Sequence, residues 1–103
     1  MSADLYKYFK DCKDYGFRDQ ITRSGLSIPS NIAEGMARSS DKEKRYFINL
    51  AMGSCAELCT QIYIAIDIGY IESSLGKEWI KKTKHTGAML TGLKKSLEKS
   101  KLD

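Results

Sequence analysis

The stretch SIPSNIAEG, from Ser27 to Gly35, is the most informative part of this sequence for the fold. It lies within a longer run, from about Phe17 to Ala37, whose apolar residues recur every three or four positions, as on one face of a helix. Pro29 sits inside this run, where a proline removes one backbone donor and crowds the preceding turn. We therefore expect a helix that is either kinked at Pro29 or broken there, with Ser27 or Ser30 recapping the chain.

A long helix of about seven turns is predicted after this one. Ser40 is suited to N-capping, and Glu43 follows it at the spacing of a capping box. The helical spacing of apolar residues then continues to Gly69, a residue type that commonly ends a helix just past its last turn.

Two further helices complete the predicted architecture. A short first helix covers about residues 3–13 and ends before Tyr15-Gly16. A last helix begins after a cap at Ser73 or Ser74 and places a mainly apolar set and a lysine set on opposite sides. The apolar set is Leu75, Trp79, Thr86, Leu90, Leu93 and Leu97, and the lysine set is Lys77, Lys81, Lys84, Lys95 and Lys99.

These elements predict one fold class, an all-α, antiparallel, up-down four-helix bundle with a shortened first helix. The length of 103 residues allows a single domain, spanning residues 1–103. A short first helix leaves apolar surface uncovered on its neighbours, and contact between copies would cover it. We therefore expect a homo-oligomer.

The cellular setting follows from what the chain lacks. Its longest apolar run, 62–66, is far shorter than the roughly 20 residues of a membrane-spanning helix. The stretch MSADLYKYFK has no apolar signal-peptide region. Cys12, Cys55 and Cys59 are odd in number and form no Cys-x-x-Cys motif, as is usual for reduced thiols. We predict a cytoplasmic protein with no membrane partner.

Candidate catalytic or metal-binding groups are few. The single histidine, His85, lies beside lysines and favours a surface position. Cys55 and Cys59 are four residues apart and could share a helix face, but a structural metal site needs about two more ligands. No glycine motif follows a predicted strand, as a phosphate-binding loop would. We expect no enzyme activity, no metal and no cofactor.

Two polar lines run along the second and third predicted helices. We interpret them as facing hydrogen-bond partners that fix helix register. A weaker alternative makes Glu34 and Glu57 a pair of acid-base carboxylates, although the Glu-x-x-His motif of di-iron bundles is absent. The first line is Gln20, Arg23, Ser27, Asn31, Glu34 and Arg38, and the second is Asn49, Ser54, Glu57 and Gln61; with Gly35, the residues Gln20, Ser27, Asn31, Glu34 and Glu57 form the predicted structural motif.

Charge is distributed unevenly along a chain whose net charge is +4. Residues 77–101 hold eight lysines against two glutamates, whereas the rest of the chain is slightly acidic. This asymmetry can mark a surface for nucleic acid or another acidic partner, although a plain solvated face also explains it. Nucleic acid would be bound through its backbone phosphates, because aromatic residues for base stacking are not interleaved with the lysines. The candidate binding residues are Arg18, Arg23, Arg38, Lys81, Lys84, Lys95 and Lys99.

The run from Gly16 to Ile71 holds a specific combination of residues, Asp19-Gln20, Arg23, Ser27-Ile28-Pro29, Asn31-Ile32-Ala33-Glu34-Gly35, Arg38, Phe47, Ala51, Gly53-Ser54 and Glu57-Leu58. With this combination the run resembles the bacterial four-helix bundle family of 23S rRNA intervening-sequence proteins. The resemblance implies a homopentameric, barrel-like ring with basic surfaces, and relatives that include the accessory protein of diversity-generating retroelements, which associates with a reverse transcriptase and nucleic acid. One departure is the first helix, which is roughly three turns shorter than usual in the family.

Two functions remain open at this point. The first is a non-enzymatic, homo-oligomeric scaffold that binds nucleic acid, RNA in particular, through its basic surfaces. The alternative is a protein-binding adaptor for a partner such as a reverse transcriptase, without direct nucleic-acid contact.

Overall fold

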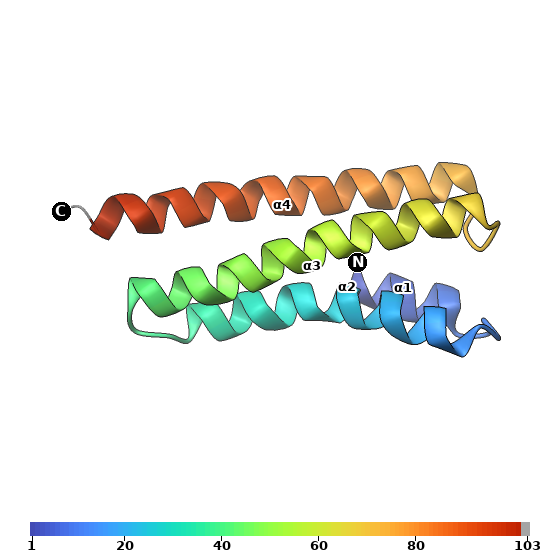
Figure 1. Cartoon of the computed structure of the whole chain (residues 1–103), viewed down its shortest axis with the longest axis horizontal. Coiled ribbons are helices and arrows are strands. Elements are labelled where there is room, and N and C mark those ends of the chain that lie inside the picture. The colour runs from blue at the N-terminus through green and yellow to red at the C-terminus, as the bar shows by residue number, and fades with distance from the viewer. Residues whose placement is uncertain (102–103) are drawn as a thin grey trace.

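The structure is a computed structural model that describes the backbone of residues 1–101 and the side chains of residues 1–98. Its elements are α1 (Ser2–Phe9), α2 (Tyr15–Met36), α3 (Asp41–Asp67) and α4 (Ser73–Lys101), with no strand in the described part of the chain. The three long helices run antiparallel in chain order, and α1 packs against one end of them (Figure 1). The predicted fold class, an all-α up-down bundle with a short first helix, is confirmed.

The two ends of α3 form as their sequence signals indicate. The Ser40 hydroxyl oxygen accepts a hydrogen bond from the Glu43 backbone N–H at 3.1 Å and donates one to the Glu43 carboxylate at 3.0 Å. Gly69 has φ +80°, a left-handed conformation that glycine adopts without strain. The Tyr70 N–H then reaches back to the Ala65 carbonyl at 2.8 Å, which closes a Schellman motif.

Of the two outcomes expected at Pro29, a kink or a break, the break is wrong. A single helix, α2, runs through this exposed proline, and neither Ser27 nor Ser30 caps a new start. Pro29 has no backbone N–H, so α2 lacks the one hydrogen bond that residue 29 would donate to the Gly25 carbonyl. A helix of this length tolerates one missing hydrogen bond. The packing of α2 against its neighbours outweighs this local penalty.

Three other predicted boundaries also need correction. The first helix ends at Phe9 rather than near residue 13, and Tyr15-Gly16 lies inside α2, because Asp14 caps that helix by accepting from the Phe17 N–H at 3.1 Å. The predicted serine caps of α4 are wrong, since Ser73 and Ser74 both lie in its first turn. The Ser74 hydroxyl donates to the Glu72 carboxylate just outside the helix, at 2.6 Å.

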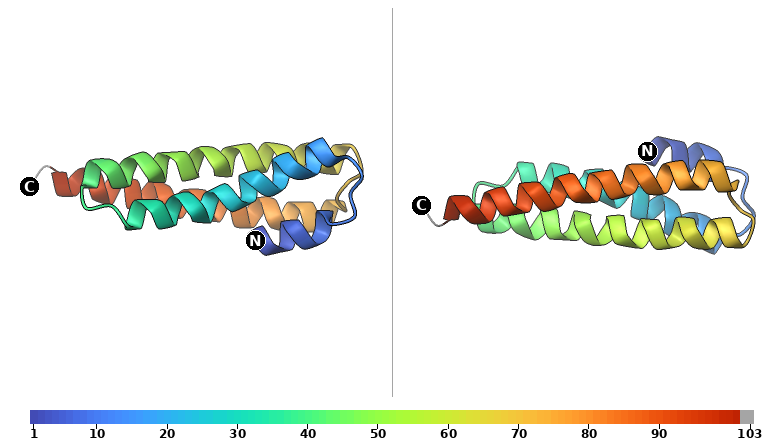
Figure 2. Two further views of the ribbon diagram at one scale, coloured as in Figure 1. Left: turned by 90° about the horizontal axis from the view of Figure 1, so that it is seen from below. Right: turned by 90° about the horizontal axis from the view of Figure 1, so that it is seen from above.

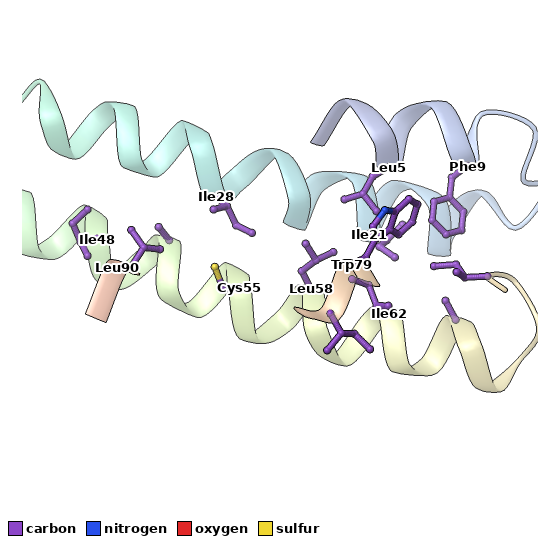
Figure 3. Packing of buried hydrophobic residues seen from close by; sticks show 14 residues of the cluster. Leu5, Phe9, Ile21, Ile28, Ile48, Cys55, Leu58, Ile62, Trp79 and Leu90 are labelled. Atoms are coloured by element: carbon purple, nitrogen blue, oxygen red, sulfur yellow. The ribbon is translucent and has the colours of Figure 1, made fainter. Parts of the chain in front are cut away.

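The hydrophobic core lies between all four helices (Figure 3). Leu5 and Phe9 are its contribution from α1, and both are almost fully buried. On α4 the buried face is rotated from the predicted one, because Ile80 and Thr83 are buried while Thr86 is only partly so. The other labelled core residues are Ile21 and Ile28 of α2, Ile48, Cys55, Leu58 and Ile62 of α3, and Trp79 and Leu90 of α4.

The short α1 leaves part of the bundle uncovered. It lies on the side of the molecule opposite α3, along one half of the long helices (Figure 2). Past its first residue, a groove of about 230 Å³ continues between α2 and α4, with Leu58 of α3 at its floor. We call this the α2–α4 groove; it is lined by Met1, Ser2, Gly25, Ile28, Pro29, Ile32, Leu58, Thr83 and Thr86.

A second uncovered surface lies on the outer side of α3. Four large apolar side chains there are between 42% and 60% exposed. Their spacings of four and fourteen residues bring them to the same side of the helix, as two pairs about 21 Å apart with the exposed Glu57 midway between them. We call this surface the α3 ridge; it consists of Tyr46, Leu50, Ile64 and Ile68.

Candidate nucleic-acid interface

A row of lysines follows the exposed side of α4. Because the buried face of α4 holds Trp79, Ile80 and Thr83, residues on the other side of the helical wheel point to solvent. Within residues 1–98 none of the row forms an ion pair, whereas the neighbouring Lys82 pairs with Glu78 at 3.3 Å. The lysine row consists of Lys77, Lys81, Lys84 and Lys95, all exposed, and the side chain of the predicted Lys99 lies outside the described residues.

The predicted arginines do not join the lysine row. Arg18 lies in the first turn of α2 and Arg38 just past its last turn, so they are about 30 Å apart along the helix. Arg18 lies over the Tyr15 ring, with its Cζ 4.8 Å from the centroid. Arg38 donates to Glu34 at 2.8 Å. Arg23 is exposed on the same helix, so the three arginines are spread along α2 rather than gathered into one site.

Tyr63 of α3 is a neighbour of the lysine row that sequence reasoning missed. Its side chain is 49% exposed, and the Lys84 ammonium lies 5.9 Å from its ring centroid. Spacing along α4 cannot reveal this ring, because it comes from the antiparallel neighbour α3. The available signal was helical spacing, since Tyr63 lies off the buried face that Ile62 and Ala65 define.

Beside Lys84 the surface is hollowed between α3 and α4, and Tyr63 lies one turn past Cys59, outside the lining of this hollow. This α3–α4 hollow has a volume of about 450 Å³. Its walls are short because several lining residues are small, and a side chain added at Gly87 would meet only Cys55 Cβ, at 3.9 Å. The lining is Met52, Cys55, Ala56 and Cys59 from α3, and Thr83, Lys84, Gly87 and Thr91 from α4.

The two cysteines in this hollow are protonated thiols near neutral pH. Burial raises the pKa of the Cys55 thiol above its ordinary value, and the neighbouring Cys59 raises it further. Burial also raises the pKa of Cys59, although the Lys84 charge acts in the opposite direction. In the described residues no three His, Cys, Asp or Glu side chains are grouped closely enough to hold a metal ion.

The seam between α2 and α3 is joined by polar side chains. The Ser27 and Ser54 hydroxyls are 2.8 Å apart, and the Asn31 amide donates to Ser27 Oγ at 2.9 Å. About one turn before Ser27 on α2, the Ser24 hydroxyl donates a hydrogen bond to the Glu57 carboxylate at 3.1 Å. Ser24 was absent from the predicted polar line, yet it is buried and reaches across the seam.

Other members of the first polar line lie outside this seam. Gln20 and Arg23 are exposed, and Glu34 pairs with Arg38 on the surface. Gly35 is buried, and a Cβ there would come within 3.2 Å of Phe47 Cβ, so the glycine permits close approach of the two helices.

Glu34 and Glu57 are not brought together as an acid-base pair. Ser24 is the α2 residue that contacts Glu57, and Glu34 lies ten residues further along the same helix, or about 15 Å away. Glu57 instead accepts from the Gln61 amide at 3.3 Å. The Gln61 Oε1 atom is buried and has no hydrogen-bond partner in the described part of the structure.

No helix in the described part of the chain is both long enough and apolar enough to cross a membrane.

These features define a class, the small antiparallel helical bundles with a basic outer helix and a polar α2–α3 seam. The model of the 23S rRNA-intervening sequence protein family matches residues 2–92. The chain therefore belongs to this family, as its resemblance over residues 16–71 indicates.

A solved structure supports the fold independently. The chain is similar to a crystal structure of a protein with unknown function from the S23 ribosomal protein family of Bacteroides thetaiotaomicron. The TM-score is 0.85 at 24% sequence identity, and the match covers 91% of this chain and 88% of the other. No curated protein matches the chain.

Proposed function

We propose that this protein is a non-enzymatic, homo-oligomeric helical bundle that binds RNA through its backbone phosphates. The observation that carries the proposal is the lysine row on α4. Its exposed ammonium groups lie along one side of a long, straight element and have no carboxylate partner within residues 1–98. A line of unpaired cations favours a polyanion without selecting a sequence, because phosphate contacts position a nucleic acid but do not identify bases.

Association between copies would repeat the lysine row around an assembly. The α3 ridge lies on the outer side of α3, whereas the α2–α4 groove opens on the side of the bundle where α1 packs, opposite α3 (Figure 2). A contact between the ridge of one copy and the groove of the next is heterologous, so it generates a ring when the rotation closes. The chain belongs to the 23S rRNA-intervening sequence protein family. The resemblance to this family implies a pentamer, which supports a closed ring.

RNA binding is tested by the salt dependence of affinity. We expect the double variant Lys81→Gln, Lys95→Gln to bind a short RNA more weakly and to reduce the slope of log K against log salt by about one per lysine. The matched control is Lys7→Gln, Lys13→Gln, which removes the same charge from α1 and the loop after it. An equal loss of RNA affinity in the two double variants, or an RNA affinity that does not change with salt concentration, would count against phosphate binding by the lysine row.

A protein-binding adaptor is the second candidate function. The α3 ridge favours it, because exposed apolar side chains of this kind often mark a protein contact. If the protein is monomeric by light scattering, the ridge is left free for a partner of another kind. A nuclease-resistant partner captured by the native chain, but not by Leu50→Glu, then supports the adaptor in place of the oligomer.

A further inference from the structure

The lysine row has an aromatic platform beside it. Tyr63 projects from α3 next to Lys84 of α4, and about half of its side chain is exposed. The α3–α4 hollow begins at the same lysine and runs along the groove between the two helices, which lie side by side (Figure 1). Positive charge, an exposed ring and a shallow, mainly apolar hollow therefore occupy one face of the molecule.

Features of these three kinds occur together in sites that bind single-stranded nucleic acid. Single-stranded nucleic acid is held by cations that follow its backbone and by aromatic rings on which its unpaired bases stack. A duplex keeps its bases stacked inside and offers only its grooves and phosphates, so it gains nothing from an exposed ring. The lysine row alone would bind both forms, whereas a ring beside it favours the single strand.

The hollow can accept a flat group because its floor is made of small residues. Ala56 on α3 and Gly87 on α4 keep it shallow and open. Only Cys55 Cβ lies within 4 Å of the position that a Cβ at Gly87 would take, so the space above Gly87 is free for a ligand. The threonine hydroxyls at positions 83 and 91 are already used within α4, where they donate to the carbonyls of Trp79 and Gly87.

We propose that Tyr63 and the α3–α4 hollow receive an unpaired base of single-stranded RNA, whose phosphates lie along Lys81 and Lys84. This inference rests on the proposed function and specifies its ligand, since phosphate contacts by themselves do not distinguish a strand from a duplex. Recognition is by ring stacking and shape, so it selects unpaired regions rather than a particular sequence.

The test compares two RNA probes of equal length, an oligouridylate and a blunt-ended duplex, by fluorescence anisotropy at low salt. Uridylate stacks weakly on itself, so its bases are free to leave the strand. We expect Tyr63→Ala to weaken oligouridylate binding about tenfold, in line with alanine substitutions at other stacking platforms, while duplex affinity and the salt slope are unchanged. Tyr63→Phe keeps the ring and is expected to bind nearly as well as the native chain.

Two further variants separate stacking from loss of structure. Gly87→Leu raises a side chain from the floor of the hollow without removing a ring or a charge, and is expected to weaken single-strand binding selectively. Tyr15→Ala is the control, because Tyr15 is a 61% exposed tyrosine that lies beneath Arg18 of α2 and does not line the α3–α4 hollow. Circular dichroism confirms that each variant is folded.

The outcomes distinguish this inference from the proposed function. If Tyr63→Ala leaves oligouridylate affinity unchanged, or weakens strand and duplex equally, the base-binding role is overturned while phosphate binding stands. If the native chain binds neither probe, both proposals fail. The inference is supported if Tyr63→Ala and Gly87→Leu lose affinity for oligouridylate but not for the duplex, while Tyr63→Phe and Tyr15→Ala keep their affinity for both probes.

Discussion

Gly25 shows how one residue decides where α1 can lie. It faces α1 from α2, and a Cβ at this position would overlap Leu5 Cδ1. Leu5 is fully buried, so it cannot turn away into solvent. The glycine therefore permits the close approach that seats α1 against the long helices.

Gly25→Ala is expected to destabilise the fold by about 1–2 kcal/mol, because overpacking costs more than the gain in helix propensity returns. Gly92→Ala is the matched control, since nothing lies within 4 Å of a Cβ there. This second change should stabilise the fold by about 0.5–1 kcal/mol through helix propensity alone. Urea unfolding followed by circular dichroism measures both, and an equal gain in the two variants would show that α1 is not held at Leu5.

Asp14 makes stability depend on pH at the start of α2. The Phe17 N–H and the Tyr70 hydroxyl both donate to its carboxylate, and these hydrogen bonds hold the pKa of Asp14 below its ordinary 3.8. A lowered pKa in the folded state means that the stabilisation is complete above the ordinary value. It is lost as the pH falls through the lowered pKa.

We expect Asp14→Ala to lower Tm at pH 7 and the difference from the native chain to shrink as the pH falls below 3.8. Thermal unfolding across an acid pH series measures the difference. A gap in Tm that stays constant down to the lowest pH would mean that the carboxylate charge does not contribute.

At the scale of elements, the α2–α3 seam shows what a pattern along the chain can and cannot predict. Spacing placed Ser27 and Asn31 on one line and Ser54 on another, and the structure joins these residues. It could not reveal that Gln20 is exposed or that Ser24 crosses the seam, because those positions depend on how far α2 is rotated toward α3. The rotation of α2 about its own axis is set by tertiary packing, and the spacing of apolar residues along one helix does not determine that packing.

The same limit explains the errors on α4. The helical period of the apolar residues by itself placed Thr86 on the core face. In the structure α4 packs against α3, and near its start it also meets α1, where the ring centroids of Tyr8 and Trp79 are 5.4 Å apart. These unequal neighbours turn Thr83 inward. By contrast, the caps at Ser40 and Gly69 were predictable, because capping depends on residues within one turn.

A double-mutant cycle tests the seam. Ser27→Ala and Ser54→Ala are each expected to cost about 1 kcal/mol, and the double variant should cost less than their sum, because the two hydroxyls bond to each other. Thr60→Ala is the control partner, since that hydroxyl donates to the Ala56 carbonyl of its own helix at 3.1 Å. If the changes in unfolding free energy for Ser27→Ala and Ser54→Ala add fully in the double variant, the hydrogen bond between the two hydroxyls does not contribute to stability.

At the scale of the whole molecule, the proposed assembly depends on two apolar surfaces that face away from each other. Leu50 and Ile64 on the α3 ridge are 42% and 46% exposed, so neither is needed for the core. Replacing them changes the surface without opening a cavity.

Leu50→Glu, Ile64→Glu is expected to convert an oligomer into a folded monomer, as measured by light scattering with circular dichroism as the check on helicity. A buried charge at a subunit contact has no partner and opposes association. The control is Ser30→Glu, Ser39→Glu, which adds the same two acids at exposed neutral positions but leaves the α3 ridge intact. An unchanged mass in the ridge variant would place the subunit contact elsewhere.

The position of α1 also gives the protein a built-in optical signal. The chain has one tryptophan, Trp79, which is 4% exposed and meets Tyr8 of α1 edge-on. When α1 lifts away, this indole becomes hydrated, while the three long helices keep their backbone hydrogen bonds. Tryptophan emission therefore follows the docking of the first helix, and far-ultraviolet ellipticity follows the rest, so partial opening can be separated from global unfolding without any label.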